Sequence, residues 1–217
     1  MAKDLALPKI YPITDRAVSG LSHLEQISAL LDGGSRLIQL RDKSAPSREL
    51  LDQAIACLEL TRQNGAMLII NDRVDIALAV GADGVHLGQD DLPPSEARRI
   101  LGDDRLIGYS THSLEQAKAA LDQPVDYIAI GPIFATRTKA DHDHPVGLEG
   151  IEHVKSVIGD IPLVAIGGIG IDDIVPVLSA GAGSVAMISS LLNEPGQISV
   201  RTKNAFKTAG QKLNVKQ

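Results

Sequence analysis

The chain has 217 residues, of which 44% are hydrophobic and 2% aromatic, and its formal net charge is −6. The negative charge, the lack of a basic run and the few aromatic residues argue against a nucleic-acid-binding surface, which needs positive stripes or stacking platforms. No stretch reaches the roughly 20 apolar residues of a membrane span, and residues 1–4 do not resemble the start of a signal peptide. We therefore expect a cytoplasmic protein that acts on small molecules and binds neither nucleic acid nor membrane.

Eight short apolar runs, evenly spaced along the chain, are predicted to be strands. They are rich in branched residues and show no polar alternation, which is typical of parallel strands buried on both faces. In chain order they cover residues 10–13, 36–40, 67–70, 84–87, 106–107, 127–130, 163–166 and 184–188.

Helical patterns separate these strands. The predicted helices cover residues 22–32, 47–64, 74–80, 95–101, 113–121, 148–158, 171–179 and about 199–209. Ser22 and Glu25 have the spacing of a capping box, and Gly33, Gly81 and Gly181 follow helix ends, where a left-handed residue is common. The alternation predicts an α/β fold, a single-domain (β/α)8 TIM barrel with parallel strands over residues 1–217. Its core is expected at about 10–192, with a C-terminal helix and tail at 193–217.

Polar residues follow the predicted strands, and the carboxyl ends of parallel barrel strands share one rim. Gln39, Arg41 and Lys43 are two residues apart, so they share a face where the second strand ends. Two cations held close together suit a phosphorylated ligand, because arginine offers a planar fork and lysine a point charge. The alternative is that Arg41 and Lys43 pair with Asp42 and nearby carboxylates on a solvated rim.

Asp72 and Asp91 follow the third and fourth strands, which are expected to be neighbours. Two carboxylates at adjacent strand ends repel each other unless a cation lies between them, and Mg²⁺ is commonly held by one or two carboxylates with phosphate and water. We predict a magnesium site at this pair. The alternative is that Asp91 opens the turn before Pro93 while Asp72 caps the helix that begins near Val74.

The longest strand-to-helix connection follows the sixth strand and contains Thr136, Thr138 and Lys139, which suit an anion and a closing loop. Gly167 and Gly168 follow the seventh strand, and residues 187–189 follow the eighth. Barrels often bind phosphate there through backbone N–H groups. The alternative is that the glycines only form tight turns. For the strand-end residues His86 and His112 we expect hydrogen-bonded rim histidines.

Seven segments together resemble the thiamine phosphate synthase family from about Tyr11 to Leu191. They are residues 39–43 (QLRDK), 71–72 (ND), 86–91 (HLGQDD), 108–112 (GYSTH), 131–139 (GPIFATRTK), 166–169 (IGGI) and 187–189 (MIS). The resemblance implies an enzyme that condenses 4-amino-2-methyl-5-(diphosphooxymethyl)pyrimidine with a thiazole phosphate, giving thiamine phosphate and diphosphate. The sequence leaves open whether the thiazole is carboxylated and whether the chain forms homo-oligomers.

The resemblance also implies roles for individual residues. The pyrimidine diphosphate would be held by Gln39, Arg41, Lys43, Asn71, Ser110 and Lys139. Of these, Arg41, Lys43, Ser110 and Lys139 would carry the catalysis. The thiazole phosphate would be held by Thr136, Arg137, Thr138, Gly167, Gly168, Ile188 and Ser189. Asp72 and Asp91 would bind Mg²⁺, the implied cofactor.

Two other functions fit parts of this pattern. A thiazole tautomerase-like paralogue would bind thiazole phosphate without coupling it, and we would expect its 136–139 segment and its paired aspartates to be eroded. A non-catalytic barrel could keep a phosphate site alone. Both the segment and the pair, Asp72 and Asp91, are intact here, which favours the transferase.

Overall fold

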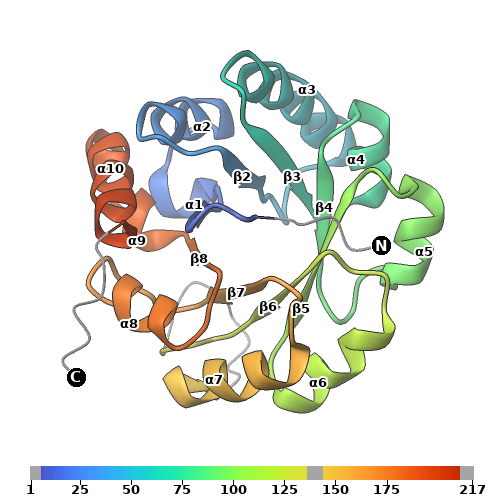
Figure 1. Ribbon diagram of the computed structural model, residues 1–217. Helices are drawn as coiled ribbons and strands as arrows, with labels where there is room; N and C mark the ends of the chain where they lie inside the picture. Colours follow the sequence, from blue (N-terminus) through green and yellow to red (C-terminus); the bar gives the residue numbers. More distant parts are fainter. Residues whose placement is uncertain (1–5, 136–143, 211–217) are drawn as a thin grey trace.

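A computed structural model describes residues 6–135 and 144–210 (Figure 1). Eight strands form one parallel sheet in the order β1-β8-β7-β6-β5-β4-β3-β2. A parallel bridge between Ile13 and Gln39 joins the two ends of this sheet, so it curls into a nearly closed barrel. The helices form a ring around the strands, as Figure 1 shows. The predicted (β/α)8 barrel is confirmed.

The strands are β1 Ile10–Pro12, β2 Leu37–Leu40, β3 Met67–Asn71, β4 Gly84–Leu87, β5 Leu106–Thr111, β6 Tyr127–Ile130, β7 Leu163–Ile166 and β8 Ser184–Met187. The main helices are α2 His23–Asp32, α3 Ser47–Gln63, α4 Val74–Val80, α5 Pro94–Leu101, α6 Leu114–Ala119, α7 Gly147–Ile158, α8 Ile174–Ser179 and α10 Ile198–Ala209. Three short helical pieces were not predicted: α1 Arg16–Ser19, α9 Ser189–Leu192 and η2 Pro195–Gln197. The helix predicted over residues 113–121 is divided into α6 and the short helix η1 Ala120–Asp122.

Two predicted boundaries were wrong by three or more residues. Strand β5 continues four residues beyond residue 107, because its polar end stays in the ladder with β6 and the Thr111 hydroxyl donates to the Ala129 carbonyl. Helix α8 begins at Ile174 and not at residue 171, because Asp173 first accepts a hydrogen bond from the Gly170 amide.

The expected helix ends are largely confirmed. Ser22 and Glu25 form the capping box of α2, each accepting from the other's backbone amide. Gly81 and Gly181 have positive φ as expected, but the left-handed residue after α2 is Gly34. Gly33 has a different reason to be glycine, since a Cβ there would lie 2.4 Å from the Cβ of Thr202 in α10.

The core is aliphatic and lies on both faces of the sheet. All four residues of β2, β4, β6 and β8 are buried. Helix α3 buries one stripe at a spacing of three to four residues, typical of a helix with one apolar face. The stripe is Leu50, Ala54, Cys57, Leu58 and Thr61. Cys57, the single cysteine, is therefore part of the core.

Charged side chains near the amino ends of the strands are tied to the backbone. Arg98 of α5 donates to the carbonyls of Gly102, Arg105 and Pro124, and its guanidinium lies 2.7 Å from the Asp126 carboxylate. The same carboxylate accepts from the Ile107 amide of β5. These contacts hold the chain where it enters β5 and β6.

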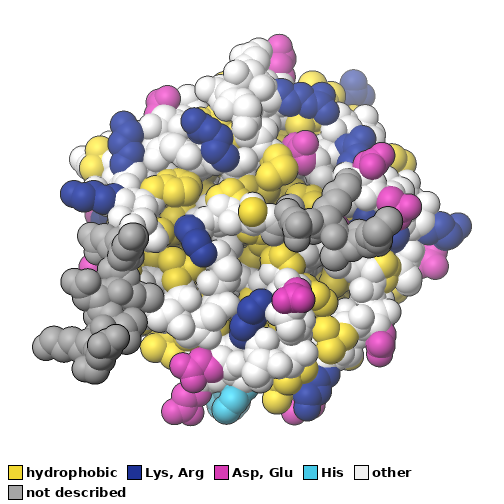
Figure 2. All heavy atoms as spheres, viewed as in Figure 1, with side chains coloured by type: hydrophobic (Ala, Val, Ile, Leu, Met, Phe, Trp, Pro, Cys, Tyr) yellow, Lys and Arg dark blue, Asp and Glu magenta, His cyan; other side chains and the backbone are white. Residues whose placement is uncertain are grey.

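On the face shown in Figure 2, basic and acidic side chains are interspersed. None of the helices within the described ranges combines the length and apolar character needed to cross a membrane.

Candidate active site

The predicted cationic face lies at the carboxyl end of β2. Gln39 is buried within the barrel, whereas Arg41 and Lys43 follow the strand at the rim. The Arg41 guanidinium donates to Asp15 at 2.7 Å, and Lys43 Nζ lies 3.6 Å from Asp72 Oδ2. The two cations therefore reach carboxylates that follow β1 and β3, on either side of β2.

The acid between them, Asp42, has other partners. Its carboxylate accepts from the amides of Ser44 and Ala45, and it lies 3.3 Å from His23 Nε2. Burial alone would raise the pKa of Asp42, but these hydrogen bonds outweigh it and lower the pKa to about 2. Of the alternative, the pairing of Arg41 and Lys43 with Asp42 is wrong, whereas their pairing with other nearby carboxylates, Asp15 and Asp72, is confirmed.

A chain of side-chain hydrogen bonds crosses the barrel interior and ends at Ser110. Gln39 donates to the Tyr11 hydroxyl at 3.1 Å, and that hydroxyl lies 3.0 Å from the hydroxyl of Tyr127. Tyr127 is 3.1 Å from His86 Nδ1, and His86 Nε2 is 2.8 Å from Ser110 Oγ. Burial raises the pKa of Tyr11 to about 12, so both tyrosines act as neutral hydrogen-bonding groups.

The sequence analysis did not single out Tyr11 and Tyr127, the two tyrosines of this series of hydrogen bonds. The signal that could have found them is compositional: the chain has only three tyrosines, and Tyr11 and Tyr127 both fall in predicted barrel strands. Buried tyrosine hydroxyls usually find a partner, so two in one aliphatic barrel suggest a polar network. Gly108 leaves room for this network, because a Cβ at residue 108 would lie 2.1 Å from the Tyr127 ring.

Asp72 and Asp91 come together at the ends of β3 and β4. The pKa of Asp72 is raised to about 6 by burial first and then by its hydrogen bond with Asp91 and the repulsion between the two carboxyls; Lys43 opposes this rise. Helix α4 has no side-chain cap, so the alternative that Asp72 caps it is wrong. Asp91 does support its turn, accepting from the Gly88 amide at 2.6 Å.

The carboxyl pair fits a magnesium ion better than a zinc site. In residues 6–135 and 144–210, no group of three or more His, Cys, Asp or Glu side chains could hold a metal. Two carboxylates supply part of an octahedral oxygen shell, and substrate phosphate and water can complete it. Burial and then the contact with Asp91 raise the pKa of Asp72, and a divalent cation between the two carboxyls would offset their repulsion. Asn71 ends β3 beside this pair.

The opposite side of the rim is built mainly from backbone. After β6, the Phe134 amide donates to the Gly167 carbonyl at 3.0 Å. A Cβ on Gly167 would lie 2.7 Å from the Cα of Pro132, and one on Gly168 would lie 2.6 Å from the Phe134 carbonyl oxygen. Both have positive φ. These glycines are therefore required by the packing of residues 132–135, whether or not a phosphate binds there.

The remaining predicted residues divide into two groups. Thr136, Arg137, Thr138 and Lys139 lie outside the described residues. Ile188 and Ser189 follow β8; Ile188 is buried, and Ser189 is exposed as the first residue of α9. Their place after β8 puts them at the same rim as the glycines that follow β7.

The expectation of hydrogen-bonded rim histidines is confirmed. His86 contacts Ser110 and Tyr127 as described, and His112 donates from Nδ1 to the Gly131 carbonyl at 2.7 Å. His112 therefore links the end of β5 to the beginning of the connection that follows β6.

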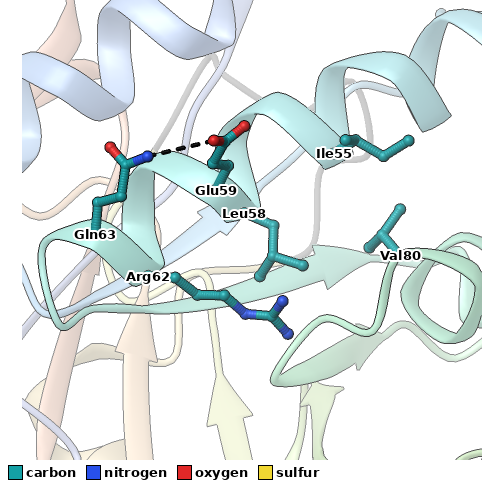
Figure 3. A pocket seen from close by; sticks show the side chains of 6 residues that line it. All are labelled: Ile55, Leu58, Glu59, Arg62, Gln63 and Val80. Carbon is teal, nitrogen blue, oxygen red and sulfur yellow. Dashed lines mark hydrogen bonds between the residues drawn. The ribbon is translucent and has the colours of Figure 1, made fainter.

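One surface groove lies away from the predicted site residues, and one cavity lies beside Asp91. A groove of about 300 Å³ runs between α3 and α4 on the outer surface, lined by Ile55, Leu58, Glu59, Arg62, Gln63 and Val80 (Figure 3). It contains none of the predicted site residues. A second cavity of about 200 Å³ is lined by Asp91 and Tyr109, among other residues.

Comparisons with known proteins agree with this arrangement of strands. Residues 10–191 match the family model described as thiamine monophosphate synthase. The chain belongs to this family. A thiamine-phosphate synthase from Azorhizobium caulinodans is 48% identical over 189 residues, covering 86% of this chain and 88% of that protein. One from Pelotomaculum thermopropionicum is 47% identical over 184 residues, covering 84% of each chain. The chain is thus an enzyme of the thiamine-phosphate synthase type, a transferase of thiamine biosynthesis.

A solved structure supports the same assignment. Thiamine phosphate pyrophosphorylase from Pyrococcus furiosus superposes with a TM-score of 0.85 at 37% identity, covering 93% of this chain and 95% of that one. Phosphoribosyl anthranilate isomerase from Thermus thermophilus, at 12% identity and a TM-score of 0.65, shares the fold alone.

Proposed function

We propose that this enzyme condenses 4-amino-2-methyl-5-(diphosphooxymethyl)pyrimidine with a thiazole phosphate, releasing diphosphate and forming thiamine phosphate. The observation that carries the proposal is the meeting of opposite charges at one rim, where Lys43 lies 3.6 Å from Asp72 and Asp72 bonds to Asp91. Cations beside a carboxyl pair suit a diphosphate bound together with a divalent metal.

In this proposal, departure of diphosphate is the main step that the protein assists. The bond between the pyrimidine methylene carbon and the diphosphate oxygen breaks, and the electron pair leaves with the diphosphate. Arg41 and Lys43 stabilise the departing anion, and the aminopyrimidine ring carries the positive charge that remains. The thiazole nitrogen then bonds to the methylene carbon through its own lone pair, so no general base is needed.

Asp72 and Asp91 would hold Mg²⁺, which when bound supplies positive charge beside the diphosphate. The Ser110 hydroxyl, held by His86 at 2.8 Å, would orient the leaving group together with Asn71. Gln39 would contribute its amide from within the barrel.

The thiazole phosphate belongs, in this proposal, at the side of the rim formed after β6, β7 and β8. The phosphate would accept hydrogen bonds from backbone amides near Gly167, Gly168, Ile188 and Ser189, and it would also be held by Thr136, Arg137 and Thr138 of the long connection. Lys139 of the same connection would reach the diphosphate. Exclusion of water by this connection would protect the cationic intermediate from capture.

Release of diphosphate from the pyrimidine substrate tests the proposal, measured with and without thiazole phosphate and Mg²⁺. We expect diphosphate and thiamine phosphate in equal amounts only when both substrates and the metal are present. A tautomerase-like paralogue or a non-catalytic phosphate-binding barrel would bind thiazole phosphate and release no diphosphate, and that result would overturn the proposal.

A further inference from the structure

A buried histidine, His23, contacts the segment that follows β2 and carries Arg41 and Lys43. His23 is the first residue of α2, and its side chain has no exposed surface. Its Nδ1 lies 2.7 Å from Thr14 Oγ1, and its Nε2 lies 3.3 Å from Asp42 Oδ2. Thr14 Oγ1 also accepts a hydrogen bond from the Arg41 amide at 3.2 Å. We call Thr14, His23 and Asp42 the His23 bridge.

One arrangement of protons satisfies every polar atom of the His23 bridge. Asp42 is a carboxylate and can only accept, so His23 must carry its proton on Nε2. Nδ1 then accepts from the Thr14 hydroxyl, and the Thr14 oxygen accepts from the Arg41 amide. Burial lowers the pKa of His23 below its ordinary value, in keeping with a neutral ring.

This arrangement determines which way the two cations point. Residues 41–43 follow the end of β2, and a bend begins at Lys43. The Asp42 carboxylate is directed back to His23, whereas the side chains of Arg41 and Lys43 are directed away from it. The two cations reach different carboxylates, Asp15 at 2.7 Å and Asp72 at 3.6 Å. The Asp42 carboxylate also accepts from the Ser44 and Ala45 amides and lies 3.6 Å from Arg16, but His23 is the residue of α2 that it contacts.

We propose that His23 is a positioning residue, which through Thr14 and Asp42 keeps Arg41 and Lys43 facing one anion without itself touching the substrate. The proposal rests on the proposed function, in which these two cations hold the diphosphate. Long cationic side chains lose much rotamer freedom when they bind, so a backbone fixed in advance lowers the cost of binding.

The ligand for the test is inorganic diphosphate, with binding to the complete protein measured by calorimetry in the presence of Mg²⁺. We expect His23→Ala to weaken diphosphate binding about tenfold, the lower range for loss of a residue that orients a ligand-binding group. Affinity for thiazole phosphate should stay within about twofold, because the side-chain contacts described for His23 are with Thr14 and Asp42 and not with the residues proposed to hold that phosphate.

A second substitution separates positioning from stability. His23→Gln places an amide where Nε2 was and can still donate to Asp42, so it should recover part of the lost affinity. Thr61→Val in α3 is the matched control: Thr61 is equally buried, but its hydroxyl bonds only to its own helix. This variant should lose stability without changing diphosphate affinity.

A double-mutant cycle gives the decisive comparison. If His23 acts through the cations, His23→Ala should have almost no further effect on diphosphate binding in a Lys43→Ala, Arg41→Ala background. An undiminished effect in that background, or equal loss of diphosphate and thiazole phosphate affinity in the single variants, would overturn the proposal. Because binding is measured apart from turnover, a wild type that binds diphosphate but makes no product would refute the proposed function alone.

Discussion

The two ends of the barrel use charged residues in opposite ways. At the amino ends of the strands, Arg98 satisfies three carbonyls and one carboxylate, and Asp126 satisfies a strand amide besides. At the carboxyl ends, the carboxyl groups of Asp72 and Asp91 contact and repel each other. Lys43 contacts Asp72, and its side chain is otherwise largely exposed. Arg98 and Asp126 are satisfied within the chain, whereas Lys43 and the two carboxyls at the other end keep charge that a ligand could neutralise.

This difference separates residues that stabilise the fold from residues that are available for chemistry. In barrel enzymes the active site lies at the carboxyl ends of the strands, and residues at the amino ends mainly stabilise the fold. Substitutions at the two ends should therefore differ in kind: at the carboxyl end, activity should fall while stability holds or rises, and at the amino end the reverse.

The largest effect is expected for Asp91→Ala. Loss of one of two metal carboxylates should reduce turnover on the order of 10³-fold and raise the Mg²⁺ concentration required, because the leaving diphosphate loses charge stabilisation worth several kcal/mol. Steady-state assays across a Mg²⁺ titration measure both effects. Asp90→Ala, which removes the neighbouring acid of the same turn, is the control. Unchanged activity in Asp91→Ala would refute the metal assignment.

Lys139→Ala should lower turnover by on the order of 10²-fold, the range for removing one preorganised charge partner. The effect should appear in the rate of diphosphate release in single-turnover assays. If the substitution changes only the dissociation constant for thiazole phosphate, Lys139 belongs to that substrate and not to the diphosphate.

At the other end, Arg98→Ala should lower the free energy of unfolding by about 2 kcal/mol, because carbonyls and the Asp126 carboxylate lose a charged donor. Turnover per folded molecule should be unchanged. Urea denaturation and an active-site-normalised assay measure the two quantities. Arg99→Ala removes a more exposed arginine of the same helix, which pairs only with Glu96, and should cost much less. A large loss of turnover in Arg98→Ala would break the comparison between the two ends.

The smallest effect is expected for Asp72→Asn without metal, and it has the opposite sign. The folded protein binds a proton at Asp72 up to pH about 6, above the ordinary value of 3.8, so ionisation of Asp72 costs stability as pH rises from 4 to above 6. Asp72→Asn should therefore gain on the order of 1 kcal/mol over the wild type at pH 7.5 and only about a third of that at pH 4.5. Asparagine also tolerates the positive φ of this residue.

Urea denaturation at the two pH values measures this gain. Asp75→Asn is the matched control, because the hydrogen-bonded ion pair with Arg73 lowers the pKa of Asp75. Loss of this ion pair should reduce the free energy of unfolding at neutral pH. A loss of stability in Asp72→Asn at pH 7.5 would show that the carboxyl pair is not a source of repulsion.

The fold could be predicted from the sequence because buried parallel strands and glycine-ended helices leave strong local patterns. The rim could be predicted in part, since residues such as Lys43 and Asp72 follow strands whose ends must meet. The partners of Arg41 and Asp42, which are Asp15 and His23, could not be predicted. Asp15 and His23 reach β2 from other elements, and only the closed barrel brings them there. The expected cytoplasmic location stays a prediction.

The central claim is that cations and a metal-binding carboxyl pair at one rim hold diphosphate together. Calorimetric titration of inorganic diphosphate into the wild type and Asp91→Asn, each with and without Mg²⁺, tests it most directly. We expect Mg²⁺ to tighten binding at least tenfold in the wild type and to have almost no effect in Asp91→Asn. Equal tightening by Mg²⁺ in both proteins would contradict the claim.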